Sequence, residues 1–479
     1  MPRSPFVRYR NLPELAGLCS MADAQAPGLA VGECVDRLKR FHYVWKRLHG
    51  IWTARITAEP IYELKSAFSH HAYLAAEHAM ALRKRVGEMR EPPLGLEETP
   101  HPGLQYACDE VLATPDTPAL LLGIYDVLLP ALCQACERYQ RETHPLADAP
   151  SRRILKFAIL ELREILDFGT AAMAGLVTAA EKAEYAEWLA ELRQALAAAG
   201  EVDGAAKPAE DAAIQLPPPR YTAQPYQYDR VPRRDARFQD GYNAGVNPEA
   251  FLYDERYRPR DKTLMMYYKR LREIDVPEMM ASIIVETTDK PWGYYLDMTR
   301  QLWDEARHAM LGEVGFIAQG VDWTKIPINF TWSLNLNTQL TPAERHAVLY
   351  FIEQGLMPRS GKRFEWEVGT ASGDELSKTF QDFDWADEVL HARIGRDWYV
   401  KDFADPKTAL DYGDKCWSKV VSHWRSYLER GLTQHRNWWP EIYLQACQVW
   451  GVAPDPAALA FATTYEHQRA DLKLLSSSG

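Results

Sequence analysis

The stretch at residues 292–319, WGYYLDMTRQLWDEARHAMLGEVGFIAQ, carries the pattern on which the predicted fold depends. One series of positions in it steps alternately by four and three residues, which is typical of a helix with one buried face. The series is Met298, Leu302, Glu305, Ala309, Gly312 and Phe316. Glu305 belongs to this face, and His308 follows one helical turn later. Because an unpaired buried carboxylate is costly, Glu305 needs a partner, and we expect a metal ion.

A second Glu-x-x-His follows 83 residues later, at Glu388 and His391, within FDWADEVLHARIGRDWYV at 383–400. The expected buried positions again step by three and four residues: Trp385, Glu388, Ala392, Gly395 and Tyr399. Carboxylate-bridged dimetal sites in four-helix bundles take one Glu-x-x-His from each of two helices and one Glu from each of the other two. The repeat therefore predicts a four-helix bundle and two further glutamates.

The first of these glutamates is expected on the helix directly before Pro291. A short loop makes that helix an antiparallel neighbour of the one carrying Glu305, so the matching level lies about fourteen residues before the loop. Glu278 is close to this level and is our prediction. Glu273 is the alternative if the helix extends further back, whereas Glu286 lies too near the turn.

The second glutamate is expected on the helix at 341–356, within TPAERHAVLYFIEQGLMP. Glu353 lies on the apolar face of this helix, whereas Glu344 lies at the N-terminus, where the helix dipole already stabilises it. The predicted metal ligands are therefore Glu278, Glu305, His308, Glu353, Glu388 and His391.

Asp304 and Asp387 each directly precede a predicted ligand. A histidine that binds a metal usually donates its other N–H to a carboxylate, which fixes the ring. We expect each aspartate to accept this hydrogen bond from the histidine on the opposite helix. The alternative is that the two aspartates form salt bridges with Arg307 and Arg393.

The remainder of the 479-residue chain also has helical periodicity, with no strand alternation of useful length. The predicted class is all-α, with a C-terminal four-helix bundle and a second, N-terminal helical domain. The predicted parts are an irregular arm at 1–33, a helical domain at 34–200, a linker or covering segment rich in Pro, Tyr and Arg at 201–262, and the bundle with its C-terminal helices at 263–479. N-terminal helices are expected at 34–57, 60–90, 118–142, 151–177 and 179–199. C-terminal helices are expected at 264–274, 277–289, 291–319, 341–356, 377–400 and 407–431, with further short helices to the C-terminus.

The helix at 60–90 is rich in potential ligands: Glu63, His70, His71, Glu77 and His78. The other N-terminal helices lack a Glu-x-x-His and offer only Glu161 and Glu164. We favour solvent-facing or packing roles for these side chains over a second metal centre, although a degenerate bundle that arose by duplication stays open.

The amino-acid composition limits the classes of function that the chain can have. The net charge of −11 argues against a general nucleic-acid binder, and 47% hydrophobic residues indicate a globular chain. The seven cysteines are scattered, and the close pair Cys133 and Cys136 fits apolar packing better than zinc binding or redox chemistry. With no signal-peptide core and no apolar run of membrane-spanning length, we expect a reduced, cytoplasmic protein.

The stretches DEARHAML (304–311) and DEVLHARIGRDW (387–398) resemble the motif helices of the ferritin-like dimetal carboxylate superfamily. This superfamily includes rubrerythrins, ribonucleotide reductase small subunits and bacterial multicomponent monooxygenases. DE-x-x-H followed by a Gly-Arg step and an aromatic residue is especially similar to a ferritin-like family related to tRNA-modifying hydroxylases. The resemblance covers about residues 263–400.

The resemblance implies a ferritin-like bundle with a di-iron site. Glu305 and Glu388 would be the catalytic metal ligands or bridges, and His308 and His391 the terminal nitrogen ligands. The single carboxylates would be Glu278 and Glu353.

Oxygen and nitrogen ligands suit iron, manganese or a mixed Fe/Mn pair. Four carboxylates offset the charge of two divalent ions and leave open coordination positions, so O₂ can bind as co-substrate. We expect a non-haem di-iron oxidoreductase of monooxygenase type that oxidises a small or medium organic substrate. An external electron donor and a dimer are compatible with this, and no membrane partner is expected. The alternatives are a hydroxylase that modifies tRNA or another macromolecule, a ferroxidase or iron-handling protein, and a binding protein that has lost its metal.

Several aromatic side chains near the motifs could exclude water from such a site, although any one of them could equally be ordinary core. They are Trp292, Tyr294, Tyr295, Trp303, Trp332, Trp385 and Trp398. The aromatic-rich residues 220–262 are expected to cover a pocket.

Overall fold

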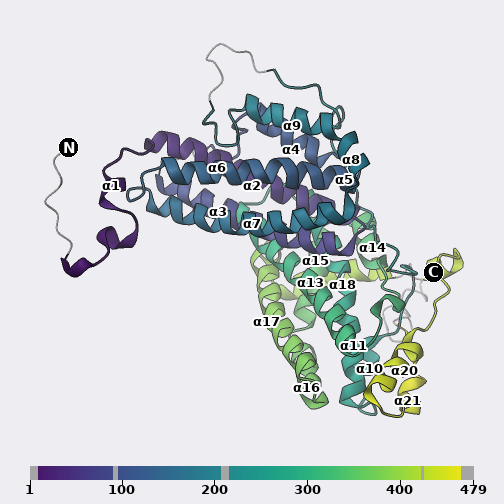
Figure 1. The fold of residues 1–479 in the computed structure, drawn as a ribbon. Helices are drawn as coiled ribbons and strands as arrows, with labels where there is room; N and C mark the ends of the chain where they lie inside the picture. Colours follow the sequence, from purple (N-terminus) through teal and green to yellow (C-terminus); the bar gives the residue numbers. More distant parts are fainter. Residues whose placement is uncertain (1–8, 90–94, 207–214, 422–424, 465–479) are drawn as a thin grey trace. The chain divides into compact units, whose positions relative to one another are not determined.

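The computed structural model describes residues 9–89, 95–206, 215–421 and 425–464, and within these residues every regular element is a helix (Figure 1). This confirms the all-α class. The chain divides into two compact units. The N-terminal unit comprises Met1–Ile51 and Leu74–Gln227, and the C-terminal unit comprises Trp52–Tyr73 and Tyr228–Gly479. Residues 52–73, expected in the N-terminal domain, thus belong to the C-terminal unit.

The N-terminal unit is built from helices α2 to α9. Their bounds are α2 Val31–Ala58, α3 Tyr62–Met89, α4 Pro102–Leu112, α5 Thr117–Leu121, α6 Leu129–Glu142, α7 Ala149–Leu176, α8 Ala179–Glu184 and α9 Ala186–Ala198, with a short α1 at Met21–Ala24. The end of α2 and the start of α3 belong to the C-terminal unit. Helix α6 packs on α7, and α4, which the sequence did not predict, packs on α9.

The helix expected at 118–142 consists of α5, a π-helical turn at Leu122–Leu128, and α6. In the part of the chain that the structure describes, Thr117–Glu142 is the one stretch long and apolar enough to cross a membrane. This corrects the expectation that no run approaches that length. Because 78% of its apolar window is buried inside the protein, its apolar side chains are used in packing.

The C-terminal unit contains the predicted motif helices. The bounds are α10 Pro248–Leu252, α11 Pro259–Arg272, α12 Asp275–Glu286, α13 Trp292–Ala318, α14 Thr331–Gln339, α15 Pro342–Gly355, α16 Lys362–Ser372, α17 Glu375–Trp398, α18 Pro406–Val421, α19 Arg425–Glu429, α20 Trp439–Trp450 and α21 Pro456–Leu459. Of these, α10, α14 and α16 were not predicted.

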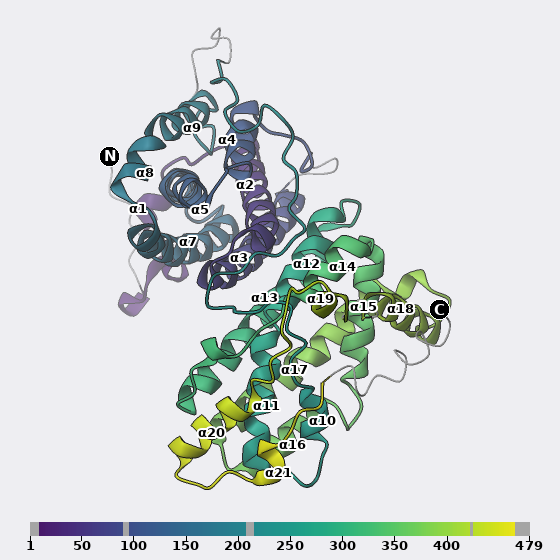
Figure 2. The same cartoon turned by 90° about the vertical axis from the view of Figure 1, so that its right-hand side faces the viewer.

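Two long helices and two interrupted ones pack around a common interior in this unit (Figures 1 and 2). Helix α13 packs on α17 and on both α11 and α12. Helix α17 packs on both α15 and α16, while α11 contacts α16 and α12 contacts α15. The successive pairs α11/α12 and α15/α16 therefore each take the place of one long helix.

The interruption between α11 and α12 falls at Glu273, where the backbone has φ −68° and ψ −1°. Pro277 has no N–H to donate to the carbonyl of Glu273 four residues earlier, so the α-helical ladder cannot continue unbroken. The N–H of Val276 donates to that carbonyl instead, at 3.0 Å. The tighter turn redirects the chain at this point.

The interruption between α15 and α16 depends on a close backbone approach at Gly361. A Cβ atom there would lie 2.1 Å from the carbonyl oxygen of Leu356, so only glycine fits. The next residue, Lys362, donates its N–H to that same carbonyl oxygen at 3.2 Å. The backbone at the start of α16 is thereby fixed.

Candidate metal centre

Five of the six predicted ligands lie together in the interior of the C-terminal unit. Together with two further residues they form two groups, and within each group the ligand atoms lie within 4.8 Å of one another. We call them the His308 cluster, which contains Glu273, His308, Asp384 and Glu388, and the His391 cluster, which contains Glu305, Glu353, Glu388 and His391. Glu388 is common to both, so the two clusters are adjacent halves of one site.

The helical stripe on α13 explains why Glu305 and His308 reach this interior. All six positions of the predicted stripe from Met298 to Phe316 are buried. Helix α13 also lies unusually close to α11, because a Cβ atom at Gly312 would lie 2.2 Å from the backbone nitrogen of Leu271. The small residue lets the ligand-bearing face approach its neighbour.

In the His391 cluster, the Nδ1 atom of His391 faces three carboxylates. It lies 3.2 Å from Oε1 of Glu305, 3.6 Å from Oε2 of Glu388 and 4.0 Å from Oε2 of Glu353. The other oxygen of Glu353, Oε1, accepts a hydrogen bond of 2.9 Å from the amide of Gln301. One nitrogen and three carboxylate oxygens thus converge, which is a plausible ligand set for a divalent ion.

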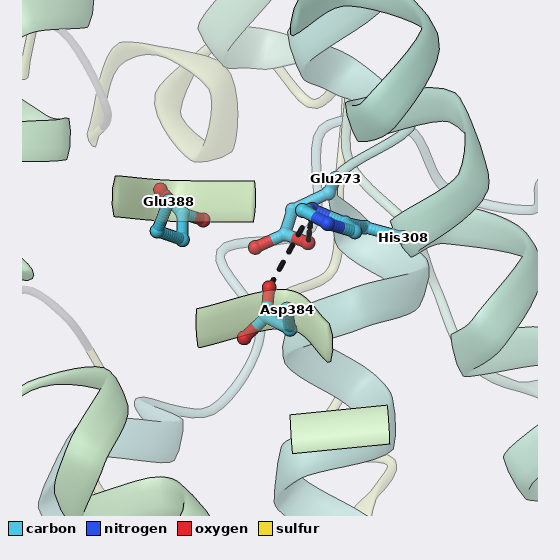
Figure 3. Close-up of side chains that lie close together, drawn as sticks. All are labelled: Glu273, His308, Asp384 and Glu388. Carbon is cyan, nitrogen blue, oxygen red and sulfur yellow. Dashed lines mark ion pairs between the residues drawn. The ribbon is translucent and has the colours of Figure 1, made fainter. Parts of the chain in front are cut away.

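The His308 cluster likewise combines one imidazole with three carboxylates, one of them from an aspartate. The Nδ1 atom of His308 lies 3.5 Å from Oε2 of Glu273 and 3.5 Å from Oδ1 of Asp384 (Figure 3). It also lies 3.5 Å from Oε2 of Glu305, whose other oxygen faces His391. Glu305 therefore directs one oxygen to each histidine, and the two rings are 6.0 Å apart between centroids.

The remaining ring nitrogens face the two aspartates in a crossed arrangement between α13 and α17. Nε2 of His308 lies 3.2 Å from Oδ2 of Asp387, and Nε2 of His391 lies 3.4 Å from Oδ2 of Asp304. An ionised carboxylate can only accept, so each Nε2 donates a proton to its aspartate, and each Nδ1 is the nitrogen that faces the cluster and could bind a metal. This is the crossed pairing expected from the sequence. Arg307 also contacts both Asp304 and Asp387, so a salt bridge accompanies the hydrogen bonds rather than replacing them.

The unsatisfied atoms of the site test whether a metal ion fits. Among the described residues, five buried ligand atoms have no hydrogen-bond partner: Nδ1 of His308, Nδ1 of His391, and Oε2 of Glu273, Glu353 and Glu388. Buried polar atoms usually have partners, and these five converge on the interior of the two clusters. A cation bound between them would satisfy these atoms, so the residues present fit a metal centre.

The pKa shifts reflect the excess of buried carboxylates in the two clusters. Burial, together with the nearby Glu388 and Glu305 carboxylates, raises the pKa of Glu353 well above its usual value. Burial alone would lower the pKa of His308, yet its hydrogen bond to Asp387 and its proximity to Glu273 and Glu305 raise it to about 10. In the metal-free protein, protons therefore offset part of the buried negative charge, and metal binding would displace them.

Glu278, predicted as a ligand, lies elsewhere. Its carboxylate is fully buried and accepts from Nζ of Lys65 at 2.6 Å, from Nη2 of Arg234 at 2.9 Å and from Oγ of Ser333 at 2.9 Å. Burial opposes ionisation, but the two cations lower its pKa to about 2. The prediction assumed a regular helix, whereas the interruption between α11 and α12 places Glu273, the alternative, at the level of His308.

Three residues of the site were not predicted: Asp384, Arg270 and Lys362. Asp384 could have been found, because it lies four residues before Glu388 and thus on the same helix face. It is fully buried, whereas Trp385, which the stripe assigned to the interior, is only partly buried. Lys362 carried no signal, because α16 was not predicted.

A cavity of about 390 Å³ adjoins the site, with Glu305, Glu353 and Glu388 in its wall. Most of the remaining lining surface is apolar and comes from Val276, Met279, Trp332, Leu336, Leu349, Ile352, Leu356 and Trp417. The other lining residues are polar or charged: Asn247, Glu249, Lys269, Arg270, Arg272, Glu273, Asp275, Ser333 and Lys362. Of the motif-flanking aromatics named from the sequence, Trp332 lines it, and the segment 220–262 contributes Asn247 and Glu249. The ligand atoms are therefore accessible to a small molecule held within the unit.

The histidines of α3 have other partners. Nε2 of His78 lies 2.5 Å from Oε2 of Glu161, His70 stacks on Trp303 at 4.5 Å, and His71 packs edge-on against Trp52. Within the described residues, the groups able to hold a metal ion are the two clusters above. The packing interpretation of α3 agrees with these contacts.

Comparison of the chain with protein-family models, curated proteins and solved structures found no match.

Proposed function

We propose that the C-terminal unit is a ferritin-like four-helix bundle that binds two metal ions, iron or its manganese or mixed counterpart, and uses O₂ to oxidise an organic substrate. The observation that carries the proposal is the sharing of Glu388 between two clusters, each containing one histidine. Two ions held on a common carboxylate are the arrangement of carboxylate-bridged dimetal sites.

The order of ligands along the chain supports the bundle assignment. Glu273 comes from the α11/α12 junction, a Glu-x-x-His from α13, Glu353 from α15, and a second Glu-x-x-His from α17. This is the order Glu, Glu-x-x-His, Glu, Glu-x-x-His, with each Glu-x-x-His on one of the two uninterrupted helices.

The residues of this chain would hold and tune the ions. His308 and His391 present Nδ1, while Asp387 and Asp304 orient the two rings from behind. When bound, the metal pair supplies the redox chemistry for O₂. The apolar wall of the adjoining cavity excludes water and places a substrate beside the ligand carboxylates.

The cavity favours an organic substrate over iron itself. Its volume of about 390 Å³ and largely apolar wall match the sites that bind small organic molecules. The net charge of −11 argues against a polynucleotide substrate. A small or medium organic molecule therefore fits best.

The experiment is anaerobic reconstitution with Fe(II), elemental analysis and then exposure to O₂. We expect about two ions per chain and O₂ uptake that a suitable organic compound stimulates. Glu388→Gln should lose most of the metal because it removes the shared ligand, whereas Glu375→Gln, an exposed position on the same helix, should retain it. Only trace metal in the reconstituted wild type would refute the proposal. O₂ uptake that depends on Fe(II) alone would favour a ferroxidase, and tight salt-sensitive tRNA binding would favour the macromolecular substrate.

A further inference from the structure

The two halves of the site differ in their share of positive charge. The Nζ atom of Lys362 lies 2.9 Å from Oε1 of Glu388, 2.9 Å from Oδ2 of Asp384 and 3.8 Å from Oε1 of Glu273. Only 1% of the Lys362 side chain is exposed. This ammonium group therefore contacts all three carboxylates of the His308 cluster.

A second cation reaches the same half. Arg270 is fully buried, lies 2.9 Å from Oε1 of Glu273 and forms an ion pair with Asp384. The three carboxylates of the His308 cluster thus face two positively charged side chains. This arrangement already compensates most of the buried negative charge there.

Among the described residues, Glu305 and Glu353 of the His391 cluster form no ion pair with a lysine or arginine, and the charge of Arg270 acts on Glu305 only at longer range. Glu305 pairs only with the two histidines among the described contacts, and Glu353 accepts a hydrogen bond from the neutral amide of Gln301. Lys362 contacts this half solely through the shared Glu388. The negative charge of the His391 cluster should therefore attract a divalent ion more strongly than that of the His308 cluster.

We propose that Lys362 makes the site asymmetric: the first metal ion binds tightly at the His391 cluster, and the second binds at the His308 cluster only when the Lys362 ammonium withdraws. The inference rests on the proposed function, because it assumes that both clusters bind metal. Lys362 acts here as a positioning residue that sets the order of loading. A metal ion and an ammonium group cannot both occupy the space between Asp384 and Glu388, since like charges repel strongly at such separations.

The structure gives Lys362 somewhere to move. Its backbone is held by the hydrogen bond to Leu356, but its side chain lines the cavity of about 390 Å³. A rotation of the flexible side chain can carry Nζ from the cluster into that cavity without any change of backbone. The second binding step then includes breaking the ion pairs of Lys362, which weakens it relative to the first.

Mn(II) binding under anaerobic conditions tests the inference, with equilibrium dialysis for stoichiometry and electron paramagnetic resonance for pairing. In the wild type we expect two steps whose dissociation constants differ by at least about tenfold. With one equivalent of Mn(II), the spectrum should be that of isolated ions. In Lys362→Met the second step should tighten by at least about tenfold, and spin-coupled pairs should form at lower occupancy. Lys362→Arg, which keeps the charge, should retain the weak second step.

The matched control is Lys65→Met, which removes a buried lysine paired with Glu278, outside both clusters. It should leave both binding steps unchanged. Circular dichroism verifies folding of each variant, and Lys362→Gln replaces the methionine variant if that one does not fold. Equal affinities at the two halves of the wild type, or an unchanged second step in both neutral variants, would overturn the inference while leaving the proposed function intact. No Mn(II) binding to the wild type would instead refute the proposed function.

Discussion

The Nε2 atom of His308 on α13 lies 3.2 Å from the Oδ2 atom of Asp387 on α17. The bond fixes the ring so that its other nitrogen faces the His308 cluster. His391 and Asp304 form the reciprocal contact from α17 to α13. Each motif helix therefore supplies both a ligand histidine and the carboxylate that orients the histidine of the other helix.

Asp387→Asn should lower metal affinity by about 10- to 100-fold, the usual effect of removing a carboxylate behind a ligand histidine. The amide is similar in shape but accepts less strongly, so the ring becomes less basic and less well oriented. Titration with Mn(II) or Fe(II) measures the change. Asp382→Asn, an exposed position on the same helix, is the control and should bind as the wild type does. Wild-type affinity in Asp387→Asn would show that the contact does not support metal binding.

The two glutamates at the α11/α12 junction should separate metal binding from stability. Glu273→Gln should reduce bound metal while changing the melting temperature little, because Arg270 keeps its ion pair with Asp384. Glu278→Gln should retain the metal but lower the free energy of unfolding by about 3–5 kcal/mol, because Lys65 loses its buried counter-charge and Arg234 keeps only its ion pair with Asp275. Elemental analysis and urea unfolding measure the two effects. The reverse outcome, with metal lost only in Glu278→Gln, would restore the assignment made from the sequence.

Gly312→Ala should destabilise the C-terminal unit by about 1–3 kcal/mol, since the new methyl group would overlap the backbone of α11 at Leu271. Gly175→Ala on α7 is the matched control, because nothing lies within 4 Å of its added Cβ. That substitution should stabilise its helix by about 0.5–1 kcal/mol. Denaturant unfolding compares the two. Equal effects would show that α11 and α13 are less closely packed than the structure indicates.

The helices of the site follow from local periodicity, which is why the sequence predicts them well. The stripe from Met298 to Phe316 on α13 is buried as expected, and the Glu-x-x-His pairs of α13 and α17 face the same interior. These features depend on spacing within one helix. They need no knowledge of the neighbouring helices.

Two features that the sequence did not predict, the place of Glu273 and that of Lys362, depend on interruptions of helices. The choice between Glu273 and Glu278 depends on whether a regular helix continues on the N-terminal side of Pro277. A helical register cannot be extrapolated through a proline-induced break. Lys362 enters the site because the close approach at Gly361 starts a new helix there. Such a reversal is set by tertiary contacts rather than by periodicity.

Finally, stability should depend on pH through His346 on α15. Its imidazole is buried against the rings of Tyr294 and Tyr399, at 6.0 and 5.5 Å. Burial, with a smaller contribution from the charge of Lys290, lowers its pKa from 6.5 to about 4. Between these values the unfolded chain binds a proton that the folded protein does not, so the free energy of unfolding falls as pH decreases from about 6.5 to 4.

At 1.36 kcal/mol per pH unit, this one group contributes up to about 3 kcal/mol to the loss of stability over that interval. His346→Phe keeps a ring between the two tyrosines but cannot titrate. Other ionisable groups titrate in both proteins, so the difference between their urea-unfolding curves at pH 4.5, 5.5 and 6.5 isolates His346. The free energy of unfolding of the wild type should fall steadily relative to that of His346→Phe as the pH is lowered. A constant difference across this range would mean that His346 has the same pKa folded and unfolded, contrary to its burial between the aromatic rings.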